Sequence, residues 1–348
     1  WNSADAPGHA LLETADGAIV VVGATDTGGP DGVDVVLMVA NTDGTPLAGW
    51  PKAYGGINAQ QAFDVVETPE GGYLIAGQTD TGSANGVDAY LLKVDDSGKV
   101  RWEQAFGGAG EARANAVVAL RDAGFAFAGR SDSPGTHGGT DAYIVTVDAN
   151  GQNPVTSWYG GAGDEEAFGL IEASDGTLVV VGDTATSGGK SVNAFVLKLN
   201  TDLAEVSSMA VGGAGTDGAR GVVEATDGAY VVVGATTSQG AGLSDAYIFK
   251  IDADLTSVLW EQVFGTENND FGAAIAPSVD GGYVLTGSTD AGDGSGVDVL
   301  IVKTDDAGVA SLNSAVGGAG ADSGNAVIET SGGAIGVAGR GAASAGVK

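Results

Sequence analysis

The sequence predicts an all-β fold, a seven-bladed β-propeller of four-stranded antiparallel blades whose seventh blade is incomplete. The main observation is an internal repeat of 52 to 54 residues that runs through all 348 residues. Each copy contains four short strand-like segments, and no stretch has the 3.6-residue apolar period of a helix. Seven copies leave no room for an unrelated domain, so we expect one domain over residues 1–348. One glycine marks each copy: Gly23, Gly77, Gly129, Gly182, Gly234, Gly287 and Gly339.

The second copy illustrates the four expected strands, at residues 62–68, 73–79, 88–94 and 100–106. Each is rich in β-branched or aromatic residues and is bounded by Gly, Asp or Ser, as is typical of strands. The second and third strands are apolar almost throughout, which indicates sheets covered on both faces. Such sheets, repeated without crossover helices, favour a propeller over the alternative fold, a parallel β-helix.

The repeat resembles the seven-bladed β-propeller repeats of secreted and surface proteins of bacteria and archaea. The resemblance rests on W-x3-F-G-G at residues 102–108, D-G-G-Y at residues 280–283 and VDAYLLKVDDSG at residues 87–98. It covers essentially the whole chain and implies the fold more strongly than a function, because such propellers serve many roles. The sequence departs from the pattern where Met209 and Leu312 replace the tryptophan of the fourth strand.

Composition excludes several classes of function. The formal net charge of −31, from 45 acidic and 14 basic residues, disfavours nucleic acid and anionic lipid as partners. The chain has no Cys, which excludes disulfides, thiolate metal sites and thiol catalysis. Only His9 and His137 are present, so no histidine cluster can form. No apolar run approaches the ~18 residues of a membrane helix, and we expect no membrane insertion.

The register of the repeat predicts an unfilled blade. Trp1 aligns just after a fourth strand and residues 346–347 align just before a third strand, which gives seven copies of strands one and two but six of strands three and four. Tight turns and longer crossings such as residues 160–167 place strand one innermost, with the long loops on one face. The seventh blade would then expose an unpaired edge. Its missing strands could lie in flanking residues, come from a neighbouring copy or partner, or be absent altogether.

Two glycine-rich segments match the residue pattern of nucleotide-binding motifs but lack their structural context. Residues 213–218 satisfy G-x-G-x-x-G, but a strand follows them, whereas the dinucleotide fingerprint requires a helix N-terminus. Residues 187–191 resemble the end of a P-loop, but Thr184 occupies the position of its first glycine. We therefore expect no nucleotide cofactor.

Acidic residues recur at the start of the third strand, where we expect them to cap the preceding loops. A metal ring at these positions is disfavoured, because facing sheets lie ~10 Å apart and Ca²⁺ requires ligands at roughly 2.3–2.6 Å. These expected capping residues are Asp34, Asp88, Asp141, Asn193, Asp245 and Asp298.

A second acidic set lies in the crossings from strand four to strand one, on the long-loop face. A solvated acidic surface is its simplest interpretation, and weak Ca²⁺ binding is the alternative hypothesis. No other cofactor is expected. The candidate residues are Asp164, Glu165, Glu166, Asp217, Asp270 and Asp322.

No catalytic set is evident from the sequence. His9 and His137 lie in loops of different copies without a recurrent Ser or Asp partner, and 45 acidic residues make any carboxylate pair uninformative. Trp50, Trp102 and Trp260 each precede an aromatic residue by four positions, which favours packing between blades over a sugar-binding platform.

The sequence therefore favours a non-catalytic, extracellular structural or adhesive module of a prokaryotic cell surface, able to self-assemble through its incomplete blade. Its expected partners are further copies of itself or other surface proteins. The alternatives are an enzyme that acts on polysaccharide and a ligand-binding scaffold, both using the acidic long-loop face.

Overall fold

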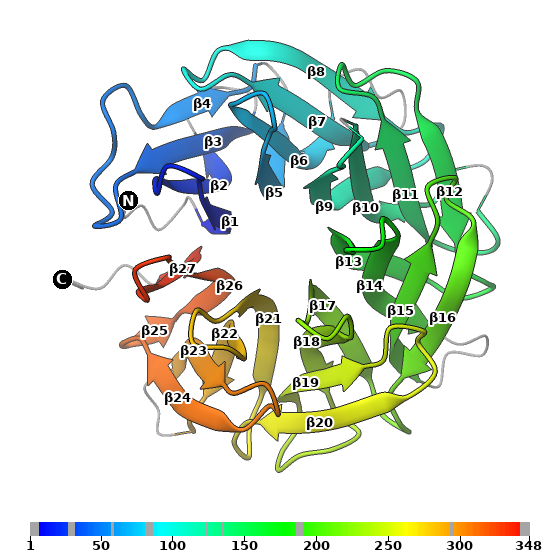
Figure 1. Ribbon diagram of the computed structural model, residues 1–348, viewed down its shortest axis with the longest axis vertical. Coiled ribbons are helices and arrows are strands. Elements are labelled where there is room, and N and C mark those ends of the chain that lie inside the picture. The colour runs from blue at the N-terminus through cyan, green and yellow to red at the C-terminus, as the bar shows by residue number, and fades with distance from the viewer. Residues whose placement is uncertain are drawn as a thin grey trace.

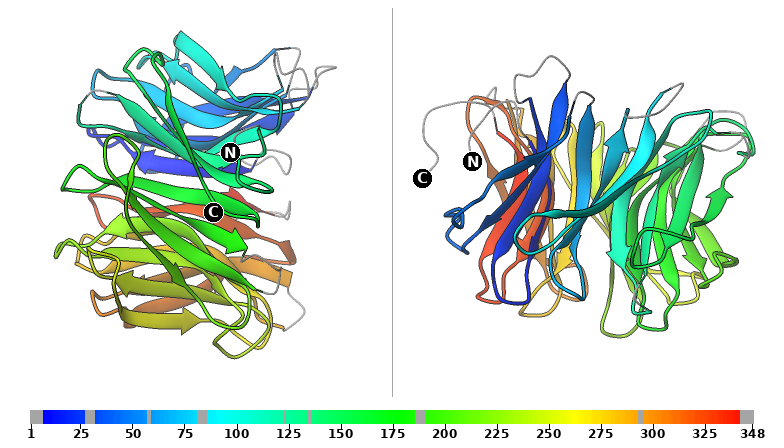
Figure 2. Two further views of the ribbon diagram at one scale, coloured as in Figure 1. Left: turned by 90° about the vertical axis from the view of Figure 1, so that its right-hand side faces the viewer. Right: turned by 90° about the horizontal axis from the view of Figure 1, so that it is seen from above.

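The computed structural model describes residues 7–26, 32–56, 59–80, 86–122, 124–133, 136–185, 191–292 and 296–341. Its strands form antiparallel sheets arranged radially around one axis (Figure 1). Viewed from the side, the sheets stand next to one another around the ring (Figure 2). The all-β propeller prediction is thus confirmed. The described residues contain no helix of the length and apolar character that a membrane span requires.

Six sheets are four-stranded blades in which consecutive strands pair, and we number them in chain order. Blade 1 contains β1 (Gly8–Glu13), β2 (Ile19–Asp26), β3 (Val33–Ala40) and β4 (Lys52–Tyr54). Blade 2 contains β5 (Gln60–Glu67), β6 (Tyr73–Thr79), β7 (Asp88–Val94) and β8 (Val100–Phe106). Blade 3 contains β9 (Ala112–Ala119), β10 (Phe125–Ser131), β11 (Asp141–Val147) and β12 (Val155–Tyr159).

The second half of the chain repeats this arrangement. Blade 4 contains β13 (Glu165–Glu172), β14 (Leu178–Ala185), β15 (Val192–Leu199) and β16 (Glu205–Val211). Blade 5 contains β17 (Asp217–Glu224), β18 (Tyr230–Thr236), β19 (Asp245–Ile251) and β20 (Val258–Phe264). Blade 6 contains β21 (Asp270–Pro277), β22 (Tyr283–Asp290), β23 (Gly296–Thr304) and β24 (Ala310–Val316), and β25 (Gly320–Ala321) pairs in parallel with β23.

The number of blades differs from the predicted seven. The structure has six four-stranded blades, and the seventh copy of the repeat forms a two-stranded sheet of β26 (Ser323–Glu329) and β27 (Ile335–Arg340). Among the described residues this copy contributes two strands, and no four-stranded sheet is formed. We call this two-stranded unit the β26–β27 sheet.

The inner ring closes between the β26–β27 sheet and blade 1. Asn325 donates a hydrogen bond to the carbonyl oxygen of Gly8 at 2.9 Å, and the backbone N–H of Ser331 donates to Glu13 at 2.7 Å. The same contact recurs between blades 4 and 5, where the N–H of Ser174 donates to Glu224 at 2.7 Å. The junction therefore resembles the others, although no covalent connection crosses it.

The first strand of every copy is innermost, as predicted. Residues of all seven first strands line a central cavity of about 310 Å³, including His9, Asp64, Asn115, Arg220 and Asn325. The third and fourth strands lie progressively further from the axis (Figure 1).

The glycine that marks each repeat faces a β-bulge in the first strand. In blade 5 the register shifts between Ala219 and Gly221, opposite Gly234. A Cβ on Gly234 would stand 1.8 Å from the carbonyl oxygen of Gly218, so only glycine fits. The same overlap with a carbonyl oxygen of the first strand recurs at five of the other six marker glycines. At Gly23 the carbonyl oxygen belongs to Pro7, directly before β1.

Apolar side chains fill the junctions between neighbouring blades. Phe249 is fully buried between blades 4 and 5. The predicted tryptophan packing is confirmed, because Trp102 lies 6.3 Å from Phe125 of the next blade and Trp260 lies 6.4 Å from Tyr283 of the next. Trp50 contacts Tyr73 in the same way at 6.4 Å.

Candidate functional site

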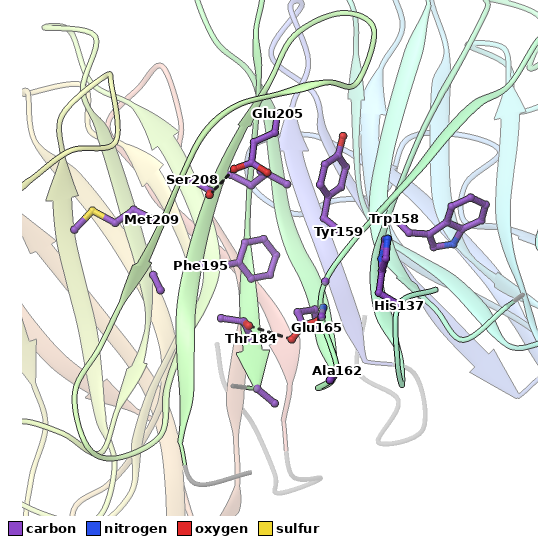
Figure 3. Close-up of a pocket in the computed structure, with 15 residues that line it drawn as sticks. His137, Trp158, Tyr159, Ala162, Glu165, Thr184, Phe195, Glu205, Ser208 and Met209 are labelled. Atoms are coloured by element: carbon purple, nitrogen blue, oxygen red, sulfur yellow. Dashed lines mark hydrogen bonds between the residues drawn. The ribbon is translucent and has the colours of Figure 1, made fainter. Parts of the chain in front are cut away.

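A pocket with a volume of about 500 Å³ lies at the junction of blades 3 and 4 (Figure 3). Trp158 and Tyr159 of β12 line one side, and Phe195 of β15 and Met209 of β16 line the other. Thr146 of β11 pairs with Val155 at the position where Lys93 of β7 pairs with Trp102. Val155 therefore occupies the position of Trp102, and this junction lacks a tryptophan there.

The polar wall of this pocket contains Glu165 and His137. Glu165 is buried and accepts hydrogen bonds from the N–H of Gly161 at 2.6 Å and the hydroxyl of Thr184 at 3.1 Å. The backbone N–H of His137 donates to Asp141 at 2.5 Å, and its imidazole Nδ1 lies 3.3 Å from the same carboxylate. This hydrogen bond to the loop before β11 is of the kind expected of a capping residue.

The pocket does not assemble an evident acyl-transfer set. His137 contacts Asp141, whereas the hydroxyl of Ser208 donates to Glu205 at 2.6 Å on the other side of the pocket (Figure 3). Aromatic walls next to carboxylates are instead suited to binding a small molecule that carries hydroxyl groups or a positive charge.

In the structure, the residues at the start of the third strands and the acidic residues of the crossings lie close together in pairs. The third-strand residue of one blade meets the first-strand residue of the next beside the first glycine after strand four. Asp141 and Glu165 each have an oxygen within 2.3 Å of the point where a Cβ on Gly160 would stand. The equivalent pairs are Asp34 with Gln60 at Gly55, Asn193 with Asp217 at Gly212, Asp245 with Asp270 at Gly265, and Asp298 with Asp322 at Gly317.

This pairing corrects one argument made from the sequence. Third strands of adjacent blades are too far apart to share an ion with each other, but each third strand reaches the first strand of the following blade. The crossing after strand four brings the two carboxylates together, which the repeat spacing alone does not reveal. At Gly107 the next first strand carries Ala112, so only Asp88 is present.

Two of the other candidate residues have different partners. Glu166 forms an ion pair with Arg113 at 3.0 Å, and Asp164 accepts a hydrogen bond from the N–H of Thr140 at 2.9 Å. No three His, Asp or Glu side chains of the described segments are grouped as a metal site. In the G-x-G-x-x-G segment, Asp217 and Gly218 begin β17 rather than a helix, and residues 186–190 of the P-loop-like segment lie outside the described residues.

Asp64 is a titrating group in the central cavity that the sequence analysis did not identify. It accepts hydrogen bonds from the N–H groups of Val65 and Val117, both at 2.8 Å. Burial raises the pKa of Asp64 to about 6, and the two hydrogen bonds oppose this rise.

The raised pKa of Asp64 predicts how the stability of the protein depends on pH. Its pKa is raised in the folded state, so the protonated form is favoured by folding, and stability is lost as the pH rises from about 4 to about 6. We expect Asp64→Asn to remove this loss, so that the variant gains melting temperature relative to the parent between pH 4 and pH 7. Asp122→Asn, in an exposed turn, is the control. A parallel pH profile for parent and Asp64→Asn would contradict the assignment.

Comparison with known proteins supports the fold and nothing finer. No family model matches the chain, and no curated protein matches it. A protein of unknown function from Dyadobacter fermentans is 13% identical with a TM-score of 0.52, over 89% of this chain and 94% of that one. Sqt1 from Chaetomium thermophilum is 14% identical with a TM-score of 0.53, over 93% of this chain and 75% of that one.

A third solved structure is that of an inactive virginiamycin B lyase from Staphylococcus aureus, at 10% identity over 82% of this chain and 93% of that one. Its TM-score of 0.48 is too low to support an argument about this chain. The fold and the comparisons together define a β-propeller protein built from repeated blades. At these identities the similarity extends to the fold alone.

Proposed function

We propose that this chain is a non-catalytic structural or adhesive propeller module on the outside of a prokaryotic cell. We further propose that the β26–β27 sheet is an incomplete seventh blade, completed by a β-hairpin of a neighbouring molecule. The single observation that carries the proposal is the exposure of apolar side chains on the two surfaces that border this sheet.

The first of these surfaces is the fourth strand of blade 6. Leu312 and Val316 of β24 are 41% and 48% exposed. Their equivalents in blade 2, Trp102 and Phe106, pack against Phe125 and Phe127 of the next blade. Leu312 and Val316 thus occupy positions that face a following blade, and they are exposed although the β26–β27 sheet supplies the two inner strands of that blade.

The second surface is the outer edge of β27. In blade 2 the equivalent strand, β6, lies between β5 and β7, and its Tyr73 and Ile75 are buried. In the described residues β27 pairs with β26 only, and its Ile335 and Val337 are half-buried. An apolar strand with one free edge is a template for β-strand addition.

Composition supports the location and the non-catalytic role. The charge of −31 and the absence of Cys suit a soluble shell exposed to salt, and the pocket at blades 3 and 4 contains His137 and Ser208 with different partners. The same pocket, with its aromatic walls, favours a second candidate function as a ligand-binding scaffold.

The proposal can be tested with a peptide copied from the chain itself. Residues 87–106, the β7–β8 hairpin, carry the pattern of the missing strands. We expect this peptide to bind, to raise the melting temperature, and to protect the amides of β27 from hydrogen exchange. By analogy with β6 and β7, Tyr90 of the peptide should lie opposite Gly339.

A peptide with proline at Tyr90 and Leu92 is the matched control, because it cannot form the ladder. Equal effects of both peptides, or no protection of β27, would rule out hairpin uptake. Light scattering of the natively isolated protein then tests the source of the hairpin. Particles of many chains support a neighbouring molecule, whereas a single chain with protected β27 amides refutes that source.

A further inference from the structure

We propose that Asp245 and Asp270 form a binding site for a divalent cation, with the ligand preference of Ca²⁺, between blades 5 and 6. Asp245 begins β19 of blade 5, and Asp270 begins β21 of blade 6. The site is independent of the hairpin proposed for the seventh repeat.

The two carboxylates are buried and directed to one place. Asp245 is 1% exposed and Asp270 is 0% exposed. Oδ1 of Asp245 and Oδ2 of Asp270 both lie within 2.8 Å of the point where a Cβ on Gly265 would stand. Two negative charges thus share a small volume from which water is largely excluded.

Most of the oxygens of this pair lack a hydrogen-bond partner. Oδ2 of Asp270 accepts the N–H of Thr266 at 2.6 Å, but Oδ1 of Asp270 and both oxygens of Asp245 accept no hydrogen bond of normal geometry. None of the ion pairs formed by the described residues includes either aspartate. Buried carboxylates without hydrogen bonds or a counter-charge are costly, so a missing cation is indicated.

The chemistry of the surroundings indicates a hard cation. Every donor at the junction is an oxygen, as Ca²⁺ prefers, and there is no sulfur or imidazole ligand. The carbonyl oxygens of Thr266 and Glu267 lie within 2.7 Å of the point where a Cβ on Gly242 would stand, so they approach the loop before Asp245. Burial raises the pKa of Asp245 and the charge of Asp270 adds to this rise, whereas the backbone N–H groups of Gly242 and Ala241, which approach the carboxylate without normal hydrogen-bond geometry, oppose it.

The other junctions provide a comparison within the same molecule. Between blades 4 and 5, Asn193 replaces the third-strand aspartate, and the single carboxylate of Asp217 is satisfied by Thr236, Ser238 and Gly213. Asp141 with Glu165 is a second pair of two acids, and Asp141 again has an unpartnered oxygen. Asp88 has an unpartnered oxygen too, but Ala112 supplies no second carboxylate there. A double charge also occurs at Asp298 with Asp322, so the proposed site is distinguished by its three carboxylate oxygens that accept no hydrogen bond of normal geometry.

These natural variants define the experiment. The metal-free protein is prepared with chelator, and CaCl₂ is titrated by calorimetry near pH 7 and low ionic strength, with MgCl₂ and NaCl in parallel. We expect saturable heat with Ca²⁺ and a rise in melting temperature of several degrees. Asp245→Asn copies the junction between blades 4 and 5, so it should fold, and it should lower the Ca²⁺ stoichiometry by one.

Asn193→Asp is the reciprocal variant, since it creates a pair of acids with Asp217. It should raise the Ca²⁺ stoichiometry by one. Without Ca²⁺, Asp245→Asn should melt above the parent, because it removes the repulsion, and added Ca²⁺ should reverse this order. No heat in the parent, or a stoichiometry unchanged by Asp245→Asn, would overturn the site and would indicate a proton shared by the two carboxyl groups instead.

Discussion

Replacement of Gly234 by alanine is expected to destabilise the protein by at least about 3 kcal/mol, more than most single substitutions. The new Cβ would overlap the carbonyl oxygen of Gly218, which is backbone and cannot rotate away. β17 and β18 would have to separate at the bulge, next to the fully buried Val232 and Val233. The measurement is the midpoint of urea unfolding, compared at constant denaturant slope.

Gly56→Ala is the matched control, because no atom lies within 4 Å of a Cβ at Gly56. We expect its unfolding midpoint to stay close to that of the parent. If Gly234→Ala were as stable as Gly56→Ala, the bulge at the repeat glycine would not be the constraint that keeps glycine in all seven copies.

Equivalent fourth-strand positions of blades 2 and 6 should respond very differently to truncation. Phe106→Ala is expected to cost roughly 3–5 kcal/mol, because the ring is buried and lies 5.3 Å from Phe127 of the next blade. Val316→Ala should cost less than about 0.5 kcal/mol, because Val316 is 48% exposed. Both free energies are measured by chemical denaturation of the isolated chain.

The hairpin peptide of residues 87–106 extends this comparison. In its presence Val316→Ala should become costly, since the bound hairpin would place the outer strands of a seventh blade beside β24. A large cost of Val316→Ala without the peptide would mean that this surface is already covered, and the proposed hairpin site would be lost.

The sequence was sufficient to predict the blades because their information is local and repeated. The apolar third strand at residues 88–94 and the turn after it recur in most copies, and the tryptophan at residue 102 recurs in three. In the structure they form β7, a tight turn and packing between blades. The sequence also placed the first strands innermost, from the lengths of the connections alone. The predicted number of blades, seven with the last incomplete, was wrong, because the structure has six blades and the seventh copy of the repeat forms a separate two-stranded sheet.

The carboxylate pairs could not be predicted because they depend on the path of a loop. Asp245 and Asp270 are in different blades, and the crossing after β20 turns at Gly265 so that both meet there. The first glycine of each crossing is recognisable in the sequence. The reason that glycine is required there, a neighbouring side chain that occupies the space a Cβ would need, is not.

The junction between β1 and β26 has a mechanical consequence. Peptide bonds cross each of the other six junctions, whereas here the attachment consists of packing and a few hydrogen bonds such as that from Asn325 to Gly8. A force that pulls Gly8 and Arg340 apart would load this junction directly. The ring should therefore rupture there first, before any strand is peeled from a blade, and should extend as a chain of intact sheets.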